Sequence, residues 1–178
     1  MKYLVASDIH GSLYYTNKLL ERISEEKPDK IILLGDLYYH GPRNPLPFGY
    51  DPMEVAKVLN QIKDKLIVLR GNCDAVVDEW ISEFQFYDFY DIEINKLNFR
   101  FTHGHIQNKD KFPENIDVLV YGHFHTGFIE KVNNKLCINA GSITLPKDNT
   151  PRSYLVIDEK VKLYHLDGSL IAEHMIGA

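Results

Sequence analysis

The sequence predicts an α/β fold in which two β-sheets pack face to face with helices on the outer faces. The first half of the 178-residue chain alternates short apolar strands with amphipathic helical stretches. The second half changes to alternating apolar and polar residues in short strands separated by turns. We therefore expect a βαβαβ arrangement from the first half and a mostly antiparallel sheet from the second. A chain of this length fits one domain, residues 1–178, that can bury a substantial core.

Three helices and three strands are predicted for the first half. The apolar run before Gly35 and Asp36 is too short for a helix and reads as a buried strand that these two residues end. Asp51 is the expected N-cap of the second helix, with Pro52 in its first turn. The predicted strands are 3–7, 31–34 and 66–69, and the predicted helices are 13–27, 52–63 and 76–81.

The second half is predicted to contain only strands and turns. A hairpin with strands 87–94 and 97–102 is expected to turn at Asn95 and Lys96, and Asn133 and Asn134 mark another tight turn. The further predicted strands are 117–121, 128–132, 136–139, 153–157, 161–166 and 169–175.

Composition and charge exclude several classes of function. Hydrophobic residues make up 44% and charged residues 25% of the sequence, as in ordinary globular proteins. The net charge of -5 argues against a protein that binds long nucleic acids, because such proteins carry basic patches. No apolar run approaches the roughly 20 residues that span a bilayer, so no membrane insertion is expected. Cys73 and Cys137 lack metal-finger spacing and no signal peptide precedes the first strand, so a cytoplasmic protein is expected.

Side chains that can bind a metal follow five of the predicted strands. They are Asp8, His10, Asp36, Asn72, His103, His123 and His125. Because ligands bind outside the carboxyl ends of strands in open α/β sheets, we expect these side chains to converge in one crevice. Each motif alone has an ordinary structural explanation, such as a helix cap for Asp8 or a turn for Asn72. The combination of imidazole and carboxylate favours manganese, iron or zinc over magnesium or calcium.

The long loop after Asp36 contains several prolines and is expected to be functional or to form an interface between subunits. Tyr39, His40 and Arg43 lie on it and could line a substrate pocket.

The ordered motifs D-x-H, G-D, G-N-C-D, T-H-G-H and G-H-F-H resemble those of the calcineurin-like metallophosphoesterase superfamily, from Tyr3 to beyond Pro146. The loop HGPRNPLPFGY and the segment NAGSITLPK are similar to those of the small bacterial YfcE-type phosphodiesterases. The resemblance implies a four-layer αββα sandwich of two mixed sheets with helices on the outer faces. It also implies two metal ions, one held by Asp8, His10, Asp36 and His125 and the other by Asp36, Asn72, His103 and His123.

The activity implied by the resemblance is metal-dependent hydrolysis of a small phosphodiester by a hydroxide that bridges two divalent ions. Manganese is the expected ion, with zinc, iron or nickel as alternatives. Among the catalytic residues, Asp36 would bridge the ions and Asn72 would bind one of them. Asp74 would orient Asn72 or a ligating histidine, or cap a helix, and His105 is a candidate acid for the leaving group.

Cys73 departs from many superfamily members, which have a histidine thought to protonate the leaving group at this position. The general acid is therefore unassigned. A phosphomonoesterase or phosphoprotein phosphatase is the second hypothesis, which the missing histidine disfavours. A non-catalytic scaffold of the same fold is the third, which the presence of all seven expected ligand types disfavours. The resemblance also implies a homo-oligomer.

Overall fold

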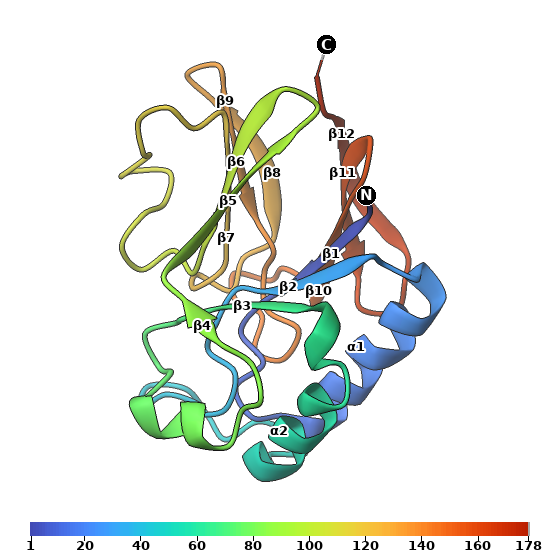
Figure 1. The fold of residues 1–178 in the computed structure, drawn as a ribbon, viewed down its shortest axis with the longest axis vertical. Helices are drawn as coiled ribbons and strands as arrows, with labels where there is room; N and C mark the ends of the chain where they lie inside the picture. Colours follow the sequence, from blue (N-terminus) through green and yellow to red (C-terminus); the bar gives the residue numbers. More distant parts are fainter. Residues whose placement is uncertain (178) are drawn as a thin grey trace.

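The computed structural model describes residues 1–177, which form two β-sheets packed face to face (Figure 1). The helices are α1 (Leu13–Glu26) and α2 (Pro52–Asn60), with short 3-10 turns η1 (Lys63–Lys65) and η2 (Val76–Trp80). The strands of the first half are β1 (Tyr3–Ala6), β2 (Lys30–Leu33), β3 (Leu66–Leu69), β4 (Phe86–Tyr87) and β5 (Phe89–Ile94). The remaining strands are β6 (Leu97–Thr102), β7 (Val118–Tyr121), β8 (Phe128–Val132), β9 (Lys135–Asn139), β10 (Ser153–Ile157), β11 (Lys160–His165) and β12 (Leu170–Met175).

Both sheets are mixed, as predicted. The seven-stranded sheet has the order β12-β11-β10-β1-β2-β3-β4, in which β1 to β4 are parallel and β10 to β12 pair antiparallel. The five-stranded sheet has the order β5-β6-β7-β9-β8, with β6, β7 and β9 parallel at its centre. The expectation of a mostly antiparallel second sheet was therefore wrong. All four residues of β7 are buried, as is typical of a central parallel strand.

Two hydrophobic layers hold the sandwich together. Val5 and Leu155 from the larger sheet pack with Phe99 and Phe101 from the smaller one, and this cluster fills the space between the sheets. Leu4 points to the opposite face, where it packs in a second cluster with residues of α1 and α2. Neighbouring strand residues thus separate into two cores because side chains alternate across a strand.

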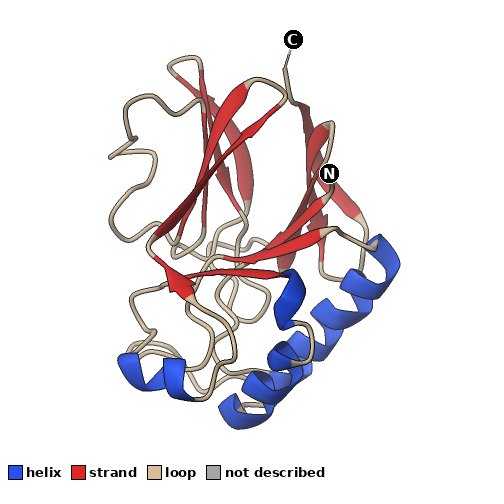
Figure 2. Cartoon of the chain, in the orientation of Figure 1, coloured by secondary structure: helices blue, strands red, loops and turns tan. Residues whose placement is uncertain are grey.

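Both α-helices lie on the outer face of the seven-stranded sheet (Figure 2). Ser12 caps α1 by accepting a hydrogen bond from the Tyr15 amide. Asp51 caps α2 by accepting from the Glu54 amide, which confirms the predicted cap. The sequence placed the end of α2 at residue 63, but the helix ends at Asn60 and the 3-10 turn η1 follows.

The αβ sandwich confirms the predicted fold class, although the second outer layer differs in detail. Within residues 1–177, no helix covers the outer face of the five-stranded sheet. The crossover from β6 to β7, residues 103–117, runs there as an irregular loop (Figure 1). Its sequence is polar and includes Gly104 and Pro113, so it lacks the apolar face that a covering helix requires. None of the helices in the described part of the chain is long and apolar enough to cross a membrane.

Five parallel strands end in the loops that carry the candidate ligands. These strands are β1, β2, β3, β6 and β7, and each is followed within a few residues by a candidate aspartate, asparagine or histidine. The sheets therefore place their carboxyl ends, and the side chains that follow them, at a common edge.

The packing between the sheets predicts a large stability difference between two leucine truncations. Leu155→Ala should lower the free energy of unfolding by about 2–5 kcal/mol, because the side chain is fully buried between the sheets. Leu170→Ala is the matched control at a site that is 51% exposed, and it should change the free energy by no more than about 0.5 kcal/mol. Urea unfolding of both variants measures the difference, and equal losses would contradict the placement of the core.

Candidate metal centre

The backbone around the predicted ligands is unusual. Asp8, His10, Asp36, His123 and His125 all have positive φ angles, between 50° and 64°. A non-glycine residue in this left-handed region is uncommon and costs on the order of 1–3 kcal/mol, and such residues cluster at functional sites as well as in turns. Five of the seven predicted ligands therefore adopt a strained conformation that the surrounding loops maintain.

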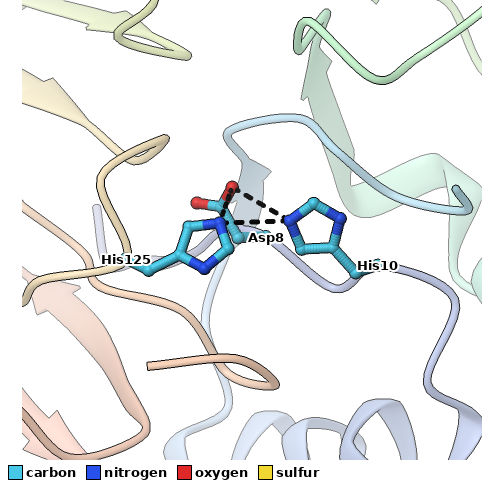
Figure 3. A group of neighbouring side chains, drawn as sticks. All are labelled: Asp8, His10 and His125. Carbon is cyan, nitrogen blue, oxygen red and sulfur yellow. Dashed lines mark hydrogen bonds and ion pairs between the residues drawn. The ribbon is translucent and has the colours of Figure 1, made fainter. Parts of the chain in front are cut away.

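Asp8, His10 and His125 form a buried group in which one carboxylate oxygen faces two imidazole nitrogens (Figure 3). Oδ1 of Asp8 lies 3.2 Å from Nε2 of His125 and 3.6 Å from Nε2 of His10. The two Nε2 atoms are 3.1 Å apart. The three atoms thus point at a common centre, as the ligands of one ion would.

Main-chain carbonyls determine which ring nitrogen of each histidine faces this centre. The Nδ1 atom donates to a carbonyl oxygen in His10 (Tyr39, 2.8 Å), His125 (Leu145, 2.6 Å) and His103 (Leu34, 2.7 Å). In a neutral ring the Nε2 atom then carries the lone pair, as a metal ligand requires.

The facing nitrogens need a positive charge between them. Two Nε2 lone pairs 3.1 Å apart repel each other unless a proton or a metal cation lies between them. Oδ1 of Asp8 is buried and has no hydrogen-bond partner within residues 1–177. Because a buried acceptor without a partner is costly, the donor set fits a divalent cation.

A second group, around Asp36 and His103, lies next to the first, and Asp36 faces a histidine of each group. Oδ2 of Asp36 is 3.8 Å from Nε2 of His10 and 3.4 Å from Nε2 of His103. The same nitrogen of His103 lies 3.0 Å from Oδ1 of Asn72. Asp36 therefore stands between the two groups, where a bridging ligand would be.

His123 completes the cluster. Its main-chain amide donates to Oδ2 of Asp8 at 2.9 Å, and its ring centroid lies 5.1 Å from that of His103. Burial and the nearby His103 lower the pKa of His123 to about 4, so its ring is neutral. The structure thus brings together all seven residues that the sequence predicted as ligands.

The carboxylates dominate the electrostatics of the cluster. Burial lowers the pKa of His103, but the hydrogen bond to Asp36 and the charges of Asp8 and Asp36 outweigh it and raise the pKa to about 9. Burial raises the pKa of Asp8, yet the facing imidazoles of His10 and His125 and the nearby charge of His103 hold this pKa well below its usual value. Ionised carboxylates therefore demand a positive partner, which is a proton on an imidazole or a metal ion.

The backbone of a glycine packs closely against each of the two aspartate side chains. The sequence analysis did not predict these contacts. Ser7 donates its hydroxyl to Oδ2 of Asp8 at 2.6 Å. A Cβ atom at Gly122 would collide with Ser7 and Asp8, and one at Gly71 would overlap Oδ1 of Asp36. The available signal was the glycine that precedes the ligand in G-H-F-H and G-N-C-D.

Asp74 holds two of the loops together. Its carboxylate accepts hydrogen bonds from the amides of Asp36 (2.7 Å), Leu37 (2.8 Å) and Gly71 (2.7 Å). Burial and the neighbouring Asp36 charge raise the pKa of Asp74 to about 6. Within residues 1–177, its oxygens bind neither Asn72 nor a histidine, in contrast to the orienting role expected from the sequence.

Cys73 and His105 lie at different depths around the cluster. The Sγ atom of Cys73 lies within 4.8 Å of ligand atoms of His10 and Asp36. Burial and the Asp36 charge raise the pKa of the Cys73 thiol to about 12. His105 is exposed, with its ring centroid 5.4 Å from that of His103 and 6.2 Å from that of His123.

A cavity of about 520 Å³ opens over the cluster. Its lining residues are His10, Asp36, Tyr39, Gly41, Pro42, Arg43, Asn44, Asn72, Cys73, His123, His125 and Lys147. Tyr39 and Arg43 were expected at a pocket from the sequence, whereas Asn44 and Lys147 were not. His40 instead packs its ring against Tyr50, with a centroid distance of 5.5 Å.

Comparisons with known proteins agree with this geometry. A family model described as the calcineurin-like phosphoesterase superfamily domain matches residues 1–162. The chain is 40% identical over 164 residues to Phosphodiesterase YfcE of Escherichia coli, covering 90% of this chain and 89% of that protein. It is 28% identical over 151 residues to a phosphodiesterase of Methanocaldococcus jannaschii, covering 79% and 83% of the two chains.

Solved structures with a similar fold include a phosphoesterase and a Vps29 protein. The Escherichia coli phosphoesterase YfcE has a TM-score of 0.95 and 37% identity, covering 99% of this chain and 100% of that chain. Vps29 of Chaetomium thermophilum has a TM-score of 0.64 and 18% identity, covering 98% and 96% of the two chains, and shares the fold alone. Because the family model matches residues 1–162 and a relative that is 40% identical covers 90% of the chain, the chain belongs to the calcineurin-like phosphoesterase superfamily.

Proposed function

We propose that this chain is a metal-dependent phosphodiesterase that hydrolyses a small phosphodiester at a centre of two divalent ions. The observation that carries the proposal is the unpaired Oδ1 of Asp8, which faces the Nε2 atoms of His10 and His125. The 40% identical relative is a phosphodiesterase, which favours a diester substrate. Residues 1–178 would form one metallophosphoesterase domain. A cytoplasmic location and self-association stay predictions from the sequence.

Asp36 would be shared by both ions. One ion would be held by Asp8, His10, Asp36 and His125, and the other by Asp36, Asn72, His103 and His123. The mixture of nitrogen and oxygen donors suits manganese, iron, zinc or nickel better than magnesium, and we propose manganese. When bound, the ions would act as Lewis acids on the phosphoryl oxygens and lower the pKa of the attacking water.

The protein itself orients the ligands and balances their charge. The Cys73 amide donates to Oδ1 of Asp36 at 2.8 Å, which leaves Oδ2 directed at His10 and His103. Asn72 adds a neutral oxygen, so the cluster with two dications bound has a formal charge of about +2. This local positive charge would bind a phosphodiester despite the net charge of -5. Asp74 would act as a positioning residue for the Asp36 loop.

The two alternative functions are less well supported. A phosphomonoesterase or phosphoprotein phosphatase would release a basic leaving group more readily with an imidazole acid, whereas this chain has Cys73. The scaffold hypothesis rests on likeness in fold. Here the ligand atoms of Asp8, His10 and His125 lie within 4.8 Å of one another, as do those of Asp8, Asp36 and His103.

Chelation should abolish hydrolysis, and manganese should restore it better than magnesium. The reason is that four imidazoles favour a borderline metal over one that prefers oxygen ligands. Hydrolysis of bis(p-nitrophenyl) phosphate, measured with elemental analysis of the same samples, tests this expectation. Full activity in a metal-free sample would overturn the two-metal proposal.

Asp36→Asn should be the most damaging change to a single ligand. An amide bridges two ions poorly, so we expect loss of both ions and a fall in activity of more than about 10²-fold. Asp74→Asn is the comparison variant, because it perturbs the Asp36 loop without removing a ligand. It should weaken metal affinity or activity by about 10–100-fold. Elemental analysis that finds two ions per chain in Asp36→Asn would move the bridging role to another residue.

The parent enzyme should depend steeply on the basicity of the leaving group. Because Cys73 does not act as a general acid, the departing oxygen must leave as an anion. Aryl diesters, which have less basic leaving groups, should therefore react much faster than alkyl diesters. A positioned acid contributes about 10²–10⁴-fold, and Cys73→His should recover part of this for basic leaving groups. A series of diesters with graded leaving groups measures the slope in the parent, Cys73→His and His105→Ala. A flat slope in the parent that becomes steep in His105→Ala would identify His105 as the acid.

A further inference from the structure

Arg43 and Lys147 lie on two different loops and line the cavity over the metal cluster. We infer that they form a second anion site and that the preferred substrate carries a phosphate or carboxylate in addition to the scissile diester. This inference rests on the proposed function and specifies its substrate class.

Neither cation has a side-chain partner among the described residues. Over residues 1–177, the side chains of Arg43 and Lys147 form no ion pair, hydrogen bond or cation–π contact, although the chain has an excess of acidic residues. The other four arginines each contact a carboxylate or carbonyl: Arg22 with Glu25, Arg70 with Glu79, Arg100 with Asp91 and Arg152 with the carbonyl of Thr144. Two unpaired cations beside one cavity suit an anionic ligand.

The main chain of Lys147 is fastened to the predicted ligand His125. The Lys147 amide donates to the His125 carbonyl at 3.0 Å. Thr150 ties the same turn together, because its hydroxyl lies within hydrogen-bond distance of both carbonyls, 2.8 Å from that of Lys147 and 3.3 Å from that of His125. The imidazole of His125 donates back to the Leu145 carbonyl at 2.6 Å. The lysine therefore extends from a base whose position relative to the cluster is fixed.

Arg43 belongs to a loop that is fastened to His10. The Tyr39 carbonyl accepts the hydrogen bond from Nδ1 of His10 at 2.8 Å. The side-chain amide of Asn44 donates to the His40 carbonyl at 2.8 Å, which closes the turn that contains Arg43. Each cation is thus linked through the backbone to one of the two facing imidazoles.

The positive charge around the cavity exceeds the charge required to bind a simple phosphodiester. A phosphodiester carries one negative charge, and the cluster with two dications bound already supplies a formal charge of about +2. The guanidinium of Arg43 matches the oxygens of a phosphate or carboxylate, and Lys147 adds a point charge. A cavity of about 520 Å³ has room for more than the reacting group. The additional charges therefore favour a substrate with a second anion.

Two matched substrates test the inference in the full-length chain with manganese. They are thymidine 5′-(p-nitrophenyl phosphate) and the same compound with a 3′-phosphate, which share the leaving group and differ by one anion. The parent should prefer the 3′-phosphate by about tenfold or more in kcat/KM, mostly through KM. Arg43→Ala and Lys147→Ala should each reduce this ratio, and the double variant should bring it close to one. Lys111→Ala removes an exposed cation outside the cavity lining and should keep the parent ratio.

A binding measurement separates this inference from the proposed function. Calorimetry should show that thymidine 3′,5′-bisphosphate binds the parent more tightly than thymidine 5′-monophosphate, and that the double variant loses the difference. Binding discrimination without hydrolysis of either ester would contradict the proposed function and support the second anion site. Equal kcat/KM values in the parent would overturn the inference. It would also be overturned if the variants slowed both substrates by the same factor, because the cations would then serve the scissile phosphate.

Discussion

Two buried carboxylates, Asp8 and Asp36, lie so close that their ligand atoms and that of His103 fall within 4.8 Å of one another. Like charges in a buried site destabilise a fold unless positive charge and hydrogen bonds compensate for them. Amide and hydroxyl donors satisfy part of this demand through Ser7, His123 and Cys73. The remainder falls on the imidazoles, or on a cation that they would hold. The strand ends and loops of the molecule are arranged around this requirement.

The geometry of the cluster depends mainly on backbone contacts. Three imidazoles are oriented by main-chain carbonyls, and the carboxylate of Asp74 is held by three main-chain amides. Loops can present these groups only if several residues adopt left-handed conformations, which accounts for the positive φ angles at five candidate ligands. The packed sheets supply the stability that maintains this strain, because each loop begins at a buried parallel strand.

With two divalent ions bound, the local charge of the site would be opposite in sign to the net charge of the chain. The chain has a net charge of -5, yet the cavity is bordered by Arg43 and Lys147 and would hold two divalent cations. An acidic surface disfavours long polyanions, whereas a focused positive site inside a cavity admits a small anion. The same arrangement therefore fits hydrolysis of a small phosphodiester better than binding to nucleic acid.

The sequence by itself determined the two main helices, the identity of the seven clustered residues and every strand except β4, which the prediction merged with β5 into one strand, 87–94. Apolar periodicity records which side of a segment is buried, and a polar residue directly after a buried strand lies at the strand end. Only the tertiary structure decided that β6, β7 and β9 are parallel, that β10 joins β1, and that Asp74 fastens the Asp36 loop. It also placed Arg43 and Lys147 beside one cavity. These features depend on contacts between segments far apart in the chain, and local periodicity contains no information about which distant segment will be the partner.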